Sequence, residues 1–284
     1  MTGTQCLWAF PVKMGTFIQQ MAEETLDNKT DNKTADLFPE ESLKEVVEAG
    51  VFYGRKKSKV NPKMRPYILA NRGGIEIINL HKTLEKLLIT TDFVRESIKK
   101  GGLALLVGTE PSAIDTVDLA KEFEFPVVSN RWLGGTLTNF EIISQRVNYL
   151  KKLRADMKAG LLDKYTKKER VGIEGEIKRL EELVGGLENL IRLPDFVLVI
   201  DPKINTTVVR EAKRMKIPLV TFTNIDADPD DLDYFVPGNT KARKSVNWFL
   251  AKIKRAIEEG KAAQALNPVV KGEKAQASEG AVIK

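Results

Sequence analysis

The chain has 284 residues, enough to bury a sizeable core as one large domain with an insertion or as two domains. Its net charge of +6 favours anionic partners, and its 42% hydrophobic content is typical of a globular protein. Cys6 and His81 are the only residues of their types, which excludes disulfides within the chain and Cys/His zinc sites and leaves His81 as the sole candidate for a histidine-based catalytic site. No run approaches the roughly 18 apolar residues of a membrane span, so we expect a soluble protein without a membrane partner.

Residues 1–37 form a polar extension that contains the near-repeat Asp27-Asn-Lys-Thr-Asp-Asn-Lys-Thr. The beginning of this extension matches neither a secretory signal nor an Arg-rich transit peptide. We expect it to be disordered, or to become ordered on a partner. The first 50 residues hold nine acidic residues against four lysines, so the positive charge lies further along the chain.

The segment from Ala49 to Ile75 combines basic and aromatic residues and has no carboxylate. Its aromatic residues are Phe52, Tyr53 and Tyr67, and its seven basic residues are Arg55, Lys56, Lys57, Lys59, Lys63, Arg65 and Arg72. Basic side chains neutralise phosphates, and aromatic faces can stack on unpaired bases. The segment therefore predicts a nucleic-acid-binding surface, with a solvated Lys-rich loop as the alternative.

From residue 39 onward the apolar pattern alternates between helices and strands. Helices are expected at 39–49, 83–99, 112–123, 206–215 and 241–259, and strands at 67–70, 75–79, 103–107, 126–128, 196–200, 218–222 and 234–236. This alternation is typical of an α/β layered domain with a largely parallel sheet. We assign this domain to residues 38–138 and 193–259, followed by a disordered tail at 260–284 that has few large apolar side chains.

Residues 139–192 interrupt this pattern with two heptad seams. Their members are spaced alternately by four and three residues: Ile143, Val147, Leu150, Arg154, Met157 and Leu161, then Ile173, Ile177, Leu180, Val184, Leu187 and Ile191. The seams predict an antiparallel coiled-coil hairpin inserted into the sheet domain, although two core helices of the main domain would show the same periodicity. An excess of basic residues between Lys151 and Arg170 favours a projecting arm. Its basic positions, with Lys151, Lys152 and Arg154 among them, are predicted to contact RNA or an acidic protein.

A glycine pair, Gly134-Gly135, lies between a predicted strand and the first hairpin helix. Backbone N–H groups at a helix N-terminus can hold a phosphate, but no phosphate-binding glycine motif is present. The favoured interpretation is a structural turn made by Arg131, Trp132, Gly134 and Gly135, in which Trp132 fills the joint between hairpin and sheet. Thr138 and Glu141 have the spacing of a capping box at the start of the helix.

Two groups of aspartates are weaker candidates for a chemical site. The loop with Asp226, Asp228, Asp230, Asp231 and Asp233 could hold a hard cation, but its spacing does not match an EF-hand, and a turn around Pro229 is favoured. Asp201 follows a strand at the sheet edge where α/β proteins bind ligands, yet no second catalytic residue accompanies it. We therefore expect no catalytic residue, no metal and no cofactor.

Several blocks, in order along the chain, resemble the bacterial-type small-subunit ribosomal protein 2 family over about residues 40–258. The blocks are Asn61-Pro-Lys-Met-Arg-Pro-Tyr, Ile77-Ile-Asn-Leu-His-Lys-Thr, Asn130-Arg-Trp-Leu-Gly-Gly-Thr-Leu-Thr-Asn, Pro194-Asp195 with Val199-Ile-Asp-Pro, and Ile217-Pro with Asp233-Tyr and Pro237-Gly-Asn. The resemblance implies a flavodoxin-like domain with a protruding coiled-coil hairpin. It also implies a non-catalytic protein of a cytoplasmic bacterial-type ribosome, rather than an organellar one, that binds small-subunit rRNA near the head–body junction. Its implied neighbours include the large protein that recruits mRNA.

The chain departs from this family at one place. Many bacterial members have Val-His-Phe-Gly-His where this chain has Val51-Phe-Tyr-Gly-Arg55, and a tryptophan where it has Val60. A metal or contact role of those histidines is therefore not carried over. Arg55, Lys56 and Lys57 are expected to contact phosphates instead.

The sequence thus predicts a structural rRNA-binding protein with no DNA partner. The alternative is an α/β enzyme or a phosphate-ligand-binding protein that uses the Gly134-Gly135 turn.

Overall fold

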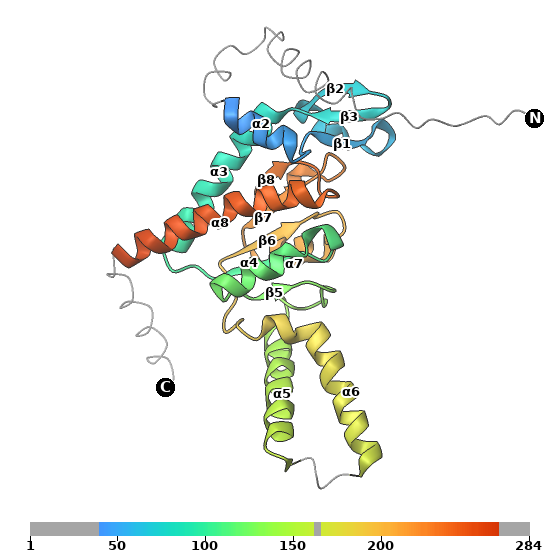
Figure 1. Ribbon diagram of the computed structural model, residues 1–284, viewed down its shortest axis with the longest axis vertical. Helices are drawn as coiled ribbons and strands as arrows, with labels where there is room; N and C mark the ends of the chain where they lie inside the picture. The colour runs from blue at the N-terminus through green and yellow to red at the C-terminus, as the bar shows by residue number, and fades with distance from the viewer. Residues whose placement is uncertain (1–39, 162–165, 267–284) are drawn as a thin grey trace, which may run out of the picture.

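A central parallel sheet organises the molecule, whose computed structural model describes residues 40–161 and 166–266 (Figure 1). The predicted extension at 1–37 and most of the predicted tail lie outside the described residues. In sequence order the strands are β4 (Ala104–Val107), β5 (Val127–Val128), β6 (Phe196–Ile200), β7 (Leu219–Thr223) and β8 (Tyr234–Pro237). They lie side by side in the order β5-β4-β6-β7-β8, all parallel, which is the flavodoxin-like order 2-1-3-4-5. The predicted α/β fold with a largely parallel sheet is confirmed.

Helices cover both faces of this sheet, which is why its strands are largely apolar and almost entirely buried. Along β6, Phe196, Leu198 and Ile200 pack into one hydrophobic cluster, and Val197 and Val199 pack into the other. The first cluster includes side chains of α3 (Leu80–Lys99), α4 (Asp115–Phe123) and α8 (Arg243–Leu266). The second includes α7 (Thr206–Met215) and the base of a helical hairpin. None of the described helices is long and apolar enough to cross a membrane.

Most element ends lie close to their predicted positions, and the largest difference is at the end of α8. This helix continues through Leu266, so the tail predicted from residue 260 begins inside a helix. Gly260 lets α8 lie directly against α3, because a Cβ there would be 2.8 Å from the carbonyl oxygen of Arg95. One residue later, the Lys261 ammonium lies 4.7 Å from the ring centre of Phe123. These contacts keep the end of α8 on the domain.

A small antiparallel sheet precedes the central one. It has the order β1-β3-β2, with β1 at Tyr53–Lys56, β2 at Ile68–Arg72 and β3 at Ile75–Ile78, and it follows α2 (Glu40–Glu48). The turn between β2 and β3 has Gly73 and Gly74 at φ of +58° and +80°. Strand β1 was not predicted, because its two basic residues hide the apolar alternation of a strand. Two 3₁₀ helices, η2 (Lys57–Lys59) and η3 (Pro62–Tyr67), join β1 to β2.

The predicted insertion lies between β5 and β6 as two helices, α5 (Phe140–Lys158) and α6 (Lys167–Val184), that project from the sheet domain (Figure 1). Near the base the seam is packed, with Ile143, Val147, Leu150, Ile177 and Val184 buried. Towards the tip the helices diverge in Figure 1, and Met157 and Leu161 are 44% and 49% exposed. The seam is therefore packed in its basal part, and a coiled coil along the whole hairpin stays a prediction.

Candidate nucleic-acid interface

Four of the predicted RNA contacts form an exposed group that we call the basic strip: Lys56, Lys57, Lys59 and Arg65. They follow one another along the end of β1, through η2 and into η3. No ion pair or side-chain hydrogen bond joins any of the four to another described residue. Because no carboxylate within residues 40–161 or 166–266 neutralises them, these side chains can meet a polyanion without first giving up an ion pair there.

Of the aromatic residues in this segment, one presents its ring to solvent. Tyr53 is 45% exposed and lies 4.1 Å, between ring centres, from the buried Phe52. Tyr67 is half-buried and packs edge-on against Phe235, with ring centres 5.3 Å apart. Stacking on an unpaired base is therefore open to Tyr53, whereas Phe52 belongs to the core, contrary to the expectation that it shares the binding surface.

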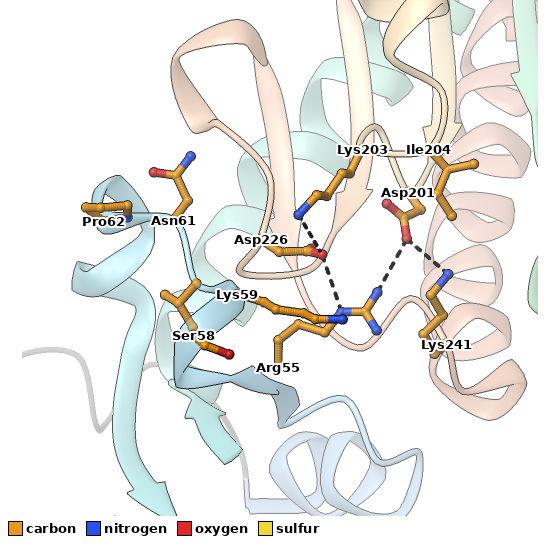
Figure 2. A pocket seen from close by; sticks show the side chains of 11 residues that line it. Arg55, Ser58, Lys59, Asn61, Pro62, Asp201, Lys203, Ile204, Asp226 and Lys241 are labelled. Carbon is orange, nitrogen blue, oxygen red and sulfur yellow. Dashed lines mark ion pairs between the residues drawn. The ribbon is translucent and has the colours of Figure 1, made fainter. Parts of the chain in front are cut away.

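Arg55 points into a cleft of about 740 Å³ at the carboxyl ends of the parallel strands, which Lys59 of the basic strip also lines (Figure 2). Its Nη2 lies 3.9 Å from Oδ2 of Asp201, which follows β6, and its Nε lies 3.5 Å from Oδ2 of Asp226, which follows β7. Both carboxylates are buried. Lys241 and Lys203 approach the same pair, at 3.6 Å from Asp201 and 3.3 Å from Asp226. The Arg55 guanidinium thus links the small sheet to the edge of the large one.

Lys63 also has internal partners, which belong to the acidic loop. Its Nζ lies 2.9 Å from Asp228 Oδ2 and 2.6 Å from Asp230 Oδ2, and hydrogen bonds to these carboxylates raise the pKa of Lys63. Within the loop, Asp228 accepts a hydrogen bond from the backbone N–H of Asp230, as in the predicted turn around Pro229. The acidic loop therefore faces lysine side chains of its own chain, which the sequence does not indicate.

Asp201 is the most enclosed carboxylate of the cleft, with 1% of its surface exposed and a left-handed backbone at φ of +56°. The Thr240 hydroxyl donates a hydrogen bond to its Oδ2 over 2.9 Å. Burial raises the pKa of Asp201 above its ordinary 3.8, and the Thr240 hydrogen bond and the charge of Lys241 oppose that rise. The folded protein therefore binds a proton at Asp201 more tightly than the unfolded chain does.

Replacing Asp201 by Asn tests whether the folded protein raises the pKa of Asp201. The stability contributed by the raised pKa is fully present below the ordinary value of 3.8 and is lost as pH rises through the raised value. We therefore expect the unfolding free energy of the wild type, minus that of Asp201→Asn, to decrease as pH rises, by about 1.4 kcal/mol for each tenfold difference in proton affinity. Asn keeps an acceptor for Thr240 and tolerates the left-handed backbone. Urea unfolding of both proteins, from pH values below 3.8 up to neutral pH, measures this difference in unfolding free energy. A difference that does not change with pH would show that the pKa of Asp201 is not raised.

The hairpin separates its three predicted RNA contacts into two groups. Lys152 is exposed and has no hydrogen-bond or ion-pair partner among the described residues. Lys151 donates from Nζ to the backbone oxygen of Glu188 over 3.0 Å, and Arg154 pairs with Glu181 over 2.8 Å and also with Glu188. Arg154 therefore fills its place in the seam by joining α5 to α6 and to the segment that follows.

The segment from Arg131 to Asn139 wraps around a carboxylate that sequence reasoning did not single out. Trp132 is buried, Gly135 has φ of +93°, and Arg131 and Gly134 are exposed. Glu211, on α7, accepts hydrogen bonds from the Trp132 indole N–H and from backbone N–H groups of this segment. A glutamate within an amphipathic helix carries no sequence signal of this role.

The predicted capping box between Thr138 and Glu141 is wrong. Helix α5 has Asn139 at its N-cap without a side-chain cap, and the Thr138 hydroxyl and backbone N–H face Glu211 instead. The N–H groups proposed for an external phosphate are thus bound to a carboxylate of the same chain, which takes away the donors that the alternative phosphate site requires.

Comparison with known proteins adds to this geometry. The family model described as "Ribosomal protein S2" matches residues 46–260. The small ribosomal subunit protein uS2 of Desulfovibrio desulfuricans is 40% identical over 240 residues, covering 84% of this chain and 92% of that protein. The protein of the same name from Thermus thermophilus is 42% identical over 212 residues, covering 74% and 83%. With the family match spanning most of the chain and the flavodoxin-like order of its sheet, the chain belongs to the ribosomal protein S2 family.

Proposed function

We propose that this protein is a structural constituent of the small ribosomal subunit and that it binds small-subunit rRNA through the basic strip. The observation that carries the proposal is the set of four exposed cations without internal partners among the described residues, in a chain that belongs to the ribosomal protein S2 family. Exposed cations neutralise phosphates and release condensed counterions, a sequence-independent source of affinity. Tyr53, beside the strip, adds a surface for stacking on an unpaired base.

The structure supports dividing the predicted contact residues by their partners. The basic strip and Lys152 are the phosphate contacts in our proposal, because their side chains are exposed and unpaired within the described part of the chain. Residues with internal partners hold the surface in place, and these are Arg55, Lys63, Lys151 and Arg154. Arg72 is half-buried on β2 and remains a predicted contact.

A non-catalytic role is part of the proposal. In flavodoxin-like sheets, ligands bind at the switch point, which here lies between β4 and β6. In this protein the Thr109 hydroxyl donates to Asn205 over 3.0 Å beside that point, and Thr240 bonds Asp201. These two hydrogen bonds join the loops in which a ligand would bind.

We further propose that the protein works on a bacterial-type cytoplasmic ribosome beside other small-subunit proteins, including the large one that recruits mRNA.

Sedimentation with small subunits depleted of this protein tests the proposal. The full chain should join the subunit fraction and bind small-subunit rRNA with an affinity that falls steeply as salt rises. Five phosphate contacts, made by the basic strip and Lys152, predict a slope of about −4 for log K against log salt, at roughly 0.7 to 0.9 per contact. A protein that stays in the soluble fraction, or that binds rRNA without dependence on salt, would show that the proposal is wrong.

A further inference from the structure

The carboxylate of Glu211 sits in a shell of hydrogen-bond donors from one segment of the chain. Oε1 accepts from the Trp132 indole Nε1 over 3.0 Å and from the Gly135 backbone N–H over 2.8 Å. Oε2 accepts from the backbone N–H groups of Leu137 and Thr138 over 3.0 and 3.4 Å. Glu211 is only 8% exposed, so these donors replace water around it. Each carboxylate oxygen therefore accepts at least two hydrogen bonds, as in a dedicated anion-binding site.

The sequence builds this shell from a tight turn placed before a helix. Gly135 takes a φ of +93°, which favours glycine, and its carbonyl oxygen accepts from the backbone N–H of Asn139. The turn leaves the N–H groups of Gly135, Leu137 and Thr138 directed at one place, just before the N-terminus of α5. An anion is favoured there by the free N–H groups and by the helix dipole. The carboxylate fills the position that an external phosphate would take.

Glu211 joins α7 to the segment that leads into the hairpin, in addition to the hydrophobic cluster that α7 shares with the base of the hairpin. Its helix, α7, lies on the central sheet through the buried side chains of Val208, Val209 and Ala212. Its hydrogen-bond donors lie immediately before α5, the first arm of the projecting hairpin (Figure 1). The other arm reaches the sheet separately: Gly186, just after the end of α6, packs so closely on β5 that a Cβ there would lie 2.1 Å from the carbonyl oxygen of Val127. The Glu211 hydrogen bonds therefore fix the first arm where it leaves the sheet.

We propose that Glu211 is a positioning residue whose carboxylate fixes the direction of the hairpin and so places Lys152 relative to the basic strip for rRNA binding. The inference rests on the proposed rRNA-binding function for its consequence, and on the five donor groups around Glu211 for its mechanism. A hairpin free to change direction reaches the binding orientation only part of the time. The apparent Kd of the protein for rRNA is the intrinsic Kd divided by the fraction of molecules whose hairpin has the binding orientation.

The test variant is Glu211→Gln, with Glu141→Gln as its matched control. Gln keeps the shape of the side chain but replaces one oxygen by an NH₂ group that faces N–H donors. Glu141 is an exposed glutamate at the start of α5, and no described residue bonds its side chain. In a Cys6→Ser background, spin labels at Ala155→Cys, an exposed position of α5, and at Lys121→Cys report the distance from hairpin to sheet domain. The NMR signal of the Trp132 indole N–H, identified by its loss in Trp132→Phe, reports the hydrogen bond itself.

We expect Glu211→Gln to move the Trp132 signal upfield, to broaden the distribution of label distances and to weaken rRNA binding by about tenfold, the loss when the competent population falls to a tenth. The control Glu141→Gln should leave the Trp132 signal, the distribution of label distances and rRNA binding unchanged. A shifted Trp132 signal with an unchanged distance distribution would overturn the inference, because the carboxylate would then be dispensable for direction. Wild-type protein that fails to bind rRNA would overturn the proposed function and leave the distance measurement to decide the positioning role.

Chemical rescue provides a second measurement, which also covers a variant that folds poorly. Glu211→Ala empties the shell, and added formate supplies a carboxylate that can bond the same N–H groups. We expect formate to raise the melting temperature of Glu211→Ala and to narrow its label-distance distribution, whereas chloride at the same concentration does neither. Equal effects of formate and chloride on Glu211→Ala, or an equal effect of formate on the wild type, would overturn the inference.

Discussion

Reversing the charge of Lys56, Lys57 and Lys59 to Glu should weaken binding to small-subunit rRNA by about 100-fold or more. It should also make the salt slope shallower by about 2 to 3, at roughly 0.7 to 0.9 for each phosphate that is no longer neutralised. The three lysines are exposed and unpaired among the described residues, so no internal ion pair is broken by the change. The melting temperature should stay close to that of the wild type, since exposed side chains away from special features contribute little to stability. Filter binding across a salt series measures the affinity and the salt slope, and thermal unfolding measures the melting temperature.

Three other exposed lysines provide the control, with the same change in net charge. Lys99, Lys121 and Lys244 lie on α3, α4 and α8, and no described residue forms an ion pair with them. Reversing these three should cost far less affinity, through the altered net charge alone. Equal losses of affinity for the two triple variants would mean that the strip has no particular role and that overall charge governs association.

The largest expected effect on stability comes from Arg55→Met. Methionine has a similar length, but it leaves the buried carboxylates of Asp201 and Asp226 without the guanidinium between them. Breaking a buried ion pair by removing one partner costs about 3–5 kcal/mol. Because Lys203 and Lys241 still face these carboxylates, we expect a smaller loss, about 2 kcal/mol. Urea unfolding at neutral pH measures the loss.

Two controls separate an internal role of Arg55 from a contact with RNA. Arg55→Lys keeps a charge in the cleft and should lose less stability than Arg55→Met. Lys59→Met, which changes a residue lining the same cleft without an ion pair to any described residue, should stay within about 0.5 kcal/mol of the wild type. If Arg55→Met leaves stability unchanged but weakens rRNA binding as strongly as a strip variant, Arg55 is a phosphate contact, as the sequence predicts.

The fold is predictable because its signals are local. Continuous apolar runs at 103–107 and 196–200 indicate strands covered on both faces, and the heptad spacing of residues 139–192 indicates the two inserted helices. Strand β1 was missed because Arg55 and Lys56 interrupt the apolar pattern. The spacing of the seam cannot show how far it stays packed, since Arg154 and Met157 continue the same periodicity.

The site is less predictable because its decisive contacts join residues far apart in the sequence. Lys63 and Asp228 are separated by 165 positions, and Trp132 and Glu211 by 79. Composition correctly identifies a basic segment, but it cannot tell which cations are neutralised by the chain's own aspartates. The same limit explains the capping-box error, because Glu141 has the right spacing whereas Glu211 comes from another helix.

The position of the hairpin within the chain has a consequence for how the sheet is assembled. Strand β4 pairs with both β5 and β6, and the whole hairpin lies in the connection between those two strands. Contacts within a helical hairpin are close in sequence and form early, whereas pairing of β4 with β6 must close a long segment. Each halving of that open segment lowers the entropic cost of closure by about 0.6 kcal/mol. We therefore expect that a hairpin formed first brings β5 and β6 closer together and accelerates completion of the sheet.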